Sequence, residues 1–81
     1  MDEQRMTELA RAALVESKRN DCEVTGAKAD GGGAWRVELM DVMLKREPFA
    51  VRVGADEQSS DEEIREAIRR AVAEHYSVES Y

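Results

Sequence analysis

The sequence predicts an α+β fold in which two helices enclose a three-stranded antiparallel meander, in the order α-β-β-β-α. Three observations indicate it. Apolar residues near both ends of the chain recur at three- and four-residue spacing, the period of a helix with one buried stripe. The central segments alternate apolar and polar residues instead, the period of a strand with one buried face, and turn signals separate these segments. Because each helix must bury its stripe, we expect both helices to pack on one face of the sheet, in a single domain spanning residues 1–81.

Residues 2–18 are predicted to form the first helix. Asp2 and Glu3 place negative charge at its start, where the helix dipole favours it. Asn20 and Asp21 are typical stop and turn residues after it. Its apolar stripe consists of Met6, Leu9, Ala10, Ala13 and Leu14.

Residues 22–29 and 34–44 are predicted to form a β-hairpin. Asp30 and the three glycines that follow it are a strong turn signal between two strand-like runs. Gly26 interrupts the alternation of the first strand, which indicates a bulge or a close approach of another backbone.

The second strand contains the only tryptophan, and its apolar period shifts midway. Its first part places on one face Trp35, Val37 and Leu39. In its second part the apolar residues are Met40, Val42 and Leu44, one residue out of phase with the first set. Either a bulge near Leu39–Met40 brings the second set inward, or this end of the strand carries an apolar patch on the outer face.

A third strand and a second helix complete the chain. Pro48 cannot donate to a sheet ladder, so it should open the strand or lie on an edge. Phe49, Val51 and Val53 then face one way, while Ala50 and Arg52 face the other, and Gly54 ends the strand.

The second helix is predicted over residues 60–76. Ser60 and Glu63 fit a capping box, in which each residue bonds the backbone of the other. Asp61 with Arg65, and Glu66 with Arg70, have the four-residue spacing of favourable ion pairs within a helix. Residues 77–81 are expected to form a frayed tail.

The element order resembles that of double-stranded RNA-binding domains. In that family a basic cluster at the start of the last helix binds phosphates, whereas the corresponding residues here are Ser60, Asp61, Glu62 and Glu63. The resemblance therefore implies the fold, but acidic residues at this place would repel RNA. The run Val24–Gly26, the glycine turn and Trp35–Glu38 also resemble the meander of PepSY-type modules, which are usually extracytoplasmic, over roughly half of the chain.

The composition argues against several classes of partner. The net charge of −6 disfavours nucleic acid or an anionic membrane surface, because both require clustered lysine and arginine. The N-terminal residues contain acids and no long apolar run, so we expect neither a signal peptide nor a membrane span. The single cysteine excludes an internal disulfide and indicates a reducing cytoplasm.

No motif for catalysis, a cofactor or a metal emerges from the sequence. Cys22 lies on the inward face of a strand and His75 continues the apolar stripe of the last helix, so we interpret both as packed residues rather than a catalytic pair. The glycine turn does not match a phosphate-binding loop. The acidic residues at 56, 57 and 61–63 lack the spacing of a calcium loop and are interpreted as capping residues. We therefore expect no enzyme, no cofactor and no bound metal.

The remaining hypothesis is a small cytoplasmic domain that acts through protein–protein contact, either as a homodimer or with another protein. The predicted contact surface is the outer sheet face or an edge strand, centred on Met40, Val42 and Leu44 with Arg36 and Arg52 beside them. The alternative is a divergent nucleic-acid-binding domain of the double-stranded-RNA-binding type, whose basic patch would add Lys45 and Arg46 to the two arginines.

Overall fold

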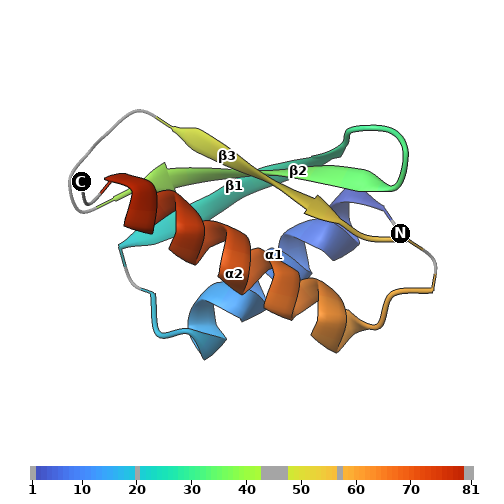
Figure 1. Cartoon of the computed structure of the whole chain (residues 1–81), viewed down its shortest axis with the longest axis horizontal. Helices are drawn as coiled ribbons and strands as arrows, with labels where there is room; N and C mark the ends of the chain where they lie inside the picture. The colour runs from blue at the N-terminus through green and yellow to red at the C-terminus, as the bar shows by residue number, and fades with distance from the viewer. Residues whose placement is uncertain (1, 20, 43–47, 57, 80–81) are drawn as a thin grey trace.

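The computed structural model describes residues 2–19, 21–42, 48–56 and 58–79, and it confirms the order α-β-β-β-α. The elements are α1 (Glu3–Glu16), β1 (Cys22–Ala29), β2 (Ala34–Asp41), β3 (Phe49–Gly54) and α2 (Asp61–Glu79). Both helices lie on one face of the sheet, with α1 packed mainly under β1 and α2 under β3 (Figure 1). The molecule therefore has two layers, and the described elements leave the other face of the sheet uncovered.

Helix α1 is shorter at both ends than the sequence predicts. Asp2 caps its start, where the Asp2 carboxylate accepts a hydrogen bond of 2.7 Å from the Arg5 N–H. At the other end Lys18 has a φ of 57°, and the Lys18 and Arg19 N–H groups donate to the carbonyls of Val15 and Leu14. This is a Schellman ending, which satisfies the last helical carbonyls two residues before the predicted stop at Asn20.

The sheet is a meander with the strand order β1-β2-β3 and antiparallel pairing throughout. The turn between β1 and β2 contains three consecutive glycines with positive φ, as the turn signal predicts. The β1–β2 register shifts between Val24 and Gly26, so Thr25 is the extra residue of a bulge. This confirms the irregularity that Gly26 predicts.

No bulge occurs on β2, so of the two alternatives that the sequence leaves open, a bulge near Leu39–Met40 is excluded. The pairing is continuous across this point, with Val24 opposite Leu39, Glu23 opposite Met40 and Cys22 opposite Asp41. The two-residue alternation therefore continues, and it directs Asp41 to the inner face. Strand β2 also ends at Asp41 rather than at residue 44, and the predicted strand residue Leu44 lies outside the described residues.

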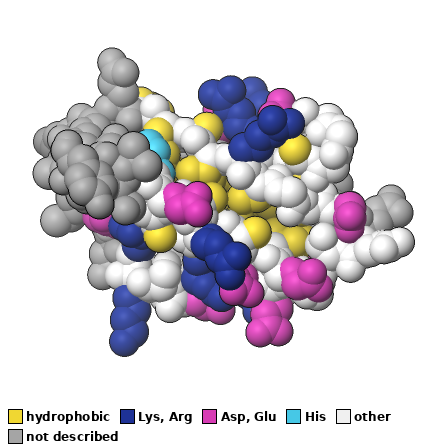
Figure 2. All heavy atoms as spheres, in the orientation of Figure 1, with side chains coloured by type: hydrophobic (Ala, Val, Ile, Leu, Met, Phe, Trp, Pro, Cys, Tyr) yellow, Lys and Arg dark blue, Asp and Glu magenta, His cyan; other side chains and the backbone are white. Residues whose placement is uncertain are grey.

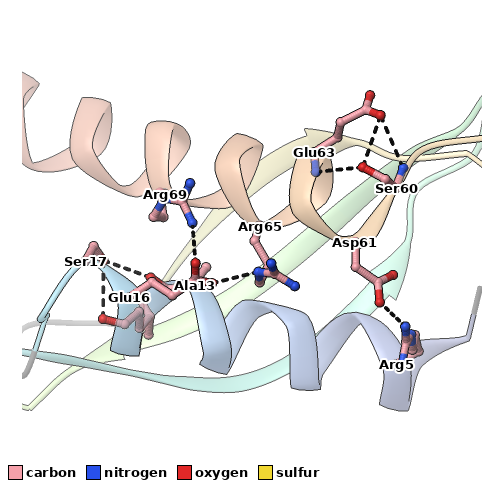
Figure 3. A network of polar contacts seen from close by, with 10 residues as sticks. Arg5, Ala13, Glu16, Ser17, Ser60, Asp61, Glu63, Arg65 and Arg69 are labelled. Carbon is pink, nitrogen blue, oxygen red and sulfur yellow. Dashed lines mark hydrogen bonds and ion pairs between the residues drawn. The ribbon is translucent and has the colours of Figure 1, made fainter.

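Helix α2 starts with the predicted capping box (Figure 3). The Glu63 N–H donates to Ser60 Oγ at 3.1 Å, and the Ser60 hydroxyl donates to Glu63 Oε1 at 3.1 Å. The helix continues to Glu79, so residues 77–79 are helical and not part of a tail. Nothing in Ser77, Val78 or Glu79 breaks a helix, which explains the greater length.

Three ion pairs of α2 connect it to α1 instead of running along the helix. Asp61 binds Arg5, and Arg65 Nε lies 2.7 Å from Glu16 Oε1, so the predicted Asp61–Arg65 pair does not form (Figure 3). Arg69 also binds Glu16, at 3.1 Å. The predicted pair between Glu66 and Arg70 is confirmed, at 3.1 Å.

The core lies between the helices and the inner sheet face. Its largest fully buried side chains come from both helices and the central strand, and they are Met6, Val37, Leu39, Ile64, Ile68 and Val72. Trp35, Val51 and Val53 are buried on the same inner face, as the alternation predicts. This packing orients the other residues of each strand toward the outer face.

Candidate interaction surface

The uncovered outer face of the sheet carries two regions of different character. The inward alternation of Trp35, Val37 and Leu39 turns the intervening residues of β2 outward. At the carboxyl end of β2 the outward residue Met40 is apolar, and near its amino end the outward residue Arg36 is cationic. The two regions are about 13 Å apart along the strand, which is the length of four residues.

The apolar region is formed by Met40 and Val42, and we call it the apolar end of the outer face. Met40 is 37% exposed and Val42 is 39% exposed. Val42 directly follows β2, and its N–H donates to the Asp21 carbonyl at 3.0 Å, which extends the β1–β2 ladder by one bond. The two side chains are therefore held by a regular backbone at a place where water contacts them.

The cationic region is a row of three side chains that crosses all three strands. Lys28 of β1 is the register partner of Arg36, and Arg36 is the register partner of Arg52 on β3. We call these three residues the cationic row. Among the described residues, Arg52 binds Asp30 at 3.2 Å, whereas neither Lys28 nor Arg36 makes an ion pair. Like charges on directly opposite residues destabilise a sheet, so this row is a feature that folding alone does not favour.

A shallow depression of about 470 Å³ runs along β3 beside the cationic row. Arg36, Arg52 and Asp30 provide its charged lining. The rest of the lining is a continuous stretch of chain at the sheet edge, Pro48, Phe49, Ala50 and Val51. Two arginines at one depression can bind a carboxylate or a phosphate through paired N–H groups.

A buried polar cluster lies on the inner face of the sheet, at the carboxyl end of β2. Asp41 is 3% exposed, and the Tyr76 hydroxyl donates to Asp41 Oδ2 at 3.4 Å. Cys22 is the register partner of Asp41 and contacts the same hydroxyl. The Arg19 guanidinium lies 4.5 Å from the centre of the Tyr76 ring. We call Asp41, Tyr76, Cys22 and Arg19 the Asp41 cluster.

The surroundings in the Asp41 cluster favour the protonated forms of the Cys22 thiol and the Tyr76 hydroxyl. Burial raises the pKa of the Cys22 thiol, and the Asp21 carboxylate raises it further. Burial likewise raises the pKa of Tyr76, and neighbouring negative charge adds to the effect. A thiol held in its protonated form is a poor nucleophile, so this arrangement indicates a structural role for Cys22.

His75 packs against an aromatic neighbour. Its ring stacks on Phe49, with the ring centres 4.0 Å apart and the planes within 3° of each other. Tyr76 meets the same Phe49 ring edge-on at 5.7 Å. These contacts attach the end of α2 to the start of β3.

The structure brings together some of the residues that the sequence singles out and separates others. Met40 and Val42 are exposed on the outer face, and Arg36 and Arg52 are neighbours on the same face. The two pairs nevertheless occupy different ends of the face, and Leu44, Lys45 and Arg46 lie outside the described residues.

Sequence reasoning did not identify Lys28 or the Asp41 cluster. Lys28 joins the arginines only through the register across the hairpin, which the sequence does not fix. A signal for Asp41 was nevertheless present, because uninterrupted alternation from Trp35 places it on the inner face, where a buried carboxylate requires partners.

The chain matches no protein-family model, no curated protein and no solved structure. Among the described residues, no group of three or more histidine, cysteine, aspartate or glutamate side chains could hold a metal ion. No helix in the described ranges is long and apolar enough to cross a membrane.

Proposed function

We propose that this protein is a small non-enzymatic domain that acts through protein–protein contact and associates with a second copy of itself. The contact uses the outer face of the sheet and is centred on its apolar end. The observation that carries the proposal is the exposure of Met40 and Val42 on a sheet face that no described element covers. Exposed apolar side chains on an uncovered sheet face favour burial against a partner.

Size and charge support the same surface. A chain of 81 residues buries only about 60% of its unfolded surface, so an added interface contributes strongly to its stability. The carboxylates of Glu23 and Glu38 lie on the outer face beside the three cations of the cationic row, and the Asp30 carboxylate binds Arg52 at its rim. This balance allows two copies of an acidic protein to approach through this face. We place the protein in the reducing cytoplasm because its single cysteine is buried and unpaired with another.

The test is the solution mass by light scattering on a sizing column, across micromolar concentrations. We expect a dimer whose association is weakened by the substitution Val42→Lys, since the lysine places a charge in the apolar contact. The matched control is Val15→Lys, because Val15 is 77% exposed on α1, on the other layer of the molecule. Equal masses for the two variants, or a wild-type monomer at all concentrations, would contradict the proposal.

A second candidate function is the binding of duplex RNA through the cationic row. The row favours it, whereas Asp61, Glu62 and Glu63 in the first turn of α2 oppose it. Binding to duplex RNA that weakens steeply with added salt would support this candidate. No binding at low salt would remove it.

A further inference from the structure

Strand β3 is an open edge of the sheet. In the part of the chain that the structure describes, β3 pairs with β2 alone, so one side of its backbone has no strand partner. The other edge strand, β1, contains the bulge at Thr25 and carries both Glu23 and Lys28, which are devices that discourage added strands. Strand β3 has no bulge and a single charged residue, Arg52. It is therefore the edge better suited to receive another strand.

The two sides of this edge differ in chemistry. Above it lies the depression whose charged lining is Arg36, Arg52 and Asp30, with Asp30 bound to Arg52, so Arg36 is its cation without an ion pair among the described residues. Below it lies α2, whose Ala67 and Ala71 are only partly buried against the core. Figure 2 shows apolar surface along the zone between β3 and α2, with dark-blue cationic side chains gathered at its upper rim. A strand added beside β3 would turn alternate side chains toward these two different surfaces.

Pairing of β3 with β3 of a second copy is disfavoured by the same residues. In an antiparallel pair centred on this strand, the two Arg52 residues become directly opposite or diagonal neighbours on the outer face. Like charges at that separation destabilise the pair. The complementary occupant is a strand that presents carboxylates to the arginines.

We propose that β3 binds an extended acidic segment of another protein as a fourth strand. Alternate carboxylates of that segment bind Arg36 and Arg52, and the intervening apolar side chains pack on Ala67 and Ala71. Main-chain hydrogen bonds to the open edge supply affinity, and the charged and apolar surfaces on either side supply the sequence preference. This proposal goes beyond the proposed function, because it names the class of a second partner and a separate site at the other end of the molecule's outer face.

The probe is a seven-residue peptide, capped at both ends, that alternates valine and glutamate. Amide chemical shifts in an NMR titration would report its dissociation constant and its position. We expect the shifts to concentrate on β3, and the affinity to fall by about tenfold in the double variant Arg36→Gln/Arg52→Gln, because charge-assisted bonds are lost. The matched control is Arg70→Gln, which removes an exposed arginine of α2 that pairs with Glu66.

Two further peptides separate the parts of the proposal. A peptide with lysine in place of glutamate should not bind, and one with glycine in place of valine should bind at least tenfold more weakly, because it has the same charge and a low strand propensity. Equal binding of the glycine peptide would show a general anion site and overturn the added strand. Equal binding of the lysine peptide, absence of binding by the acidic peptide, or tighter binding of duplex RNA would overturn the proposal.

The outcome is independent of self-association through the apolar end. Val42→Lys removes that contact and leaves β3 unchanged, so the peptide titration is repeated on this variant. Binding that persists in Val42→Lys supports the β3 site even where the dimer is absent. If neither variant nor wild type binds the peptide while the wild type is dimeric, the β3 proposal fails and the proposed function stands.

Discussion

At the scale of single residues, the structure is most informative where a polar side chain is buried. Asp41 occupies an inward position of β2, and a buried carboxylate is costly unless donors surround it. The Tyr76 hydroxyl is one such donor, and it comes from a helix 35 residues further along the chain. The Asp41 cluster therefore couples the end of the sheet to the end of α2.

Removing the hydroxyl of Tyr76 tests this coupling. We expect Tyr76→Phe to lower the free energy of unfolding by about 1 kcal/mol, because Asp41 loses a donor in a buried place. The phenylalanine ring retains the packing against Phe49 and the contact with Arg19. Urea unfolding at neutral pH measures the change, and an unaltered stability would mean that this bond contributes nothing.

The titration of Cys22 gives a second prediction at this scale. Its pKa in the folded protein is raised above the ordinary value of 9.0, so folding favours the protonated thiol. The stabilisation is complete below pH 9.0 and is lost as the pH rises toward the folded-state pKa. We expect the free energy of unfolding to fall more steeply between pH 8.5 and pH 10 in the wild type than in Cys22→Ala. Parallel slopes in the two proteins would contradict the assignment.

At the scale of elements, β2 decides which residues the molecule presents. Leu39 is fully buried, and Met40, the next residue, is 37% exposed on the opposite face. We expect Leu39→Ala to cost about 3 kcal/mol of stability and Met40→Ala less than about 0.5 kcal/mol in the monomer. Urea unfolding at low protein concentration compares the two. Similar losses would indicate a bulge that turns Met40 inward.

Signals confined to one element were readable from the sequence. The capping box of Ser60 and Glu63, the glycine turn and the alternation around Trp35 each depend on residues that are neighbours along the chain. Interactions between elements were not readable. The Arg5–Asp61 ion pair joins residues 56 positions apart, so the helical spacing of Asp61 and Arg65 predicted the wrong partner.

For the candidate surface too, features within one strand could be predicted from the sequence, and features that join several strands could not. The shift in the apolar period of β2 predicted exposed Met40 and Val42 side chains as one of two alternatives. This shift can be seen within a single strand of the sequence. The cationic row depends on two strand registers, and the Thr25 bulge alters one of them. A single sequence contains no measure of those registers, so the adjacency of Lys28 to Arg36 emerged only from the fold.

At the scale of the whole molecule, the distribution of charge separates the two proposed contacts. Two copies with a net charge of −6 repel each other. Salt at physiological ionic strength screens this repulsion between charges that are more than about 8 Å apart. We expect self-association to strengthen as sodium chloride rises from low to physiological concentration. Binding of the acidic peptide at β3 should weaken over the same range, since it depends on attraction to Arg36 and Arg52. Light scattering and the NMR titration measure the two trends, and trends of the same sign would contradict this separation.

The central claim is that a second copy covers the apolar end of the outer sheet face. An isotope-filtered nuclear Overhauser experiment on a mixture of labelled and unlabelled protein tests it most directly, because it detects only contacts between copies. We predict intermolecular contacts from the Met40 and Val42 methyl groups. Intermolecular contacts from Val15 and the helical layer, with none from Met40 or Val42, would contradict the account.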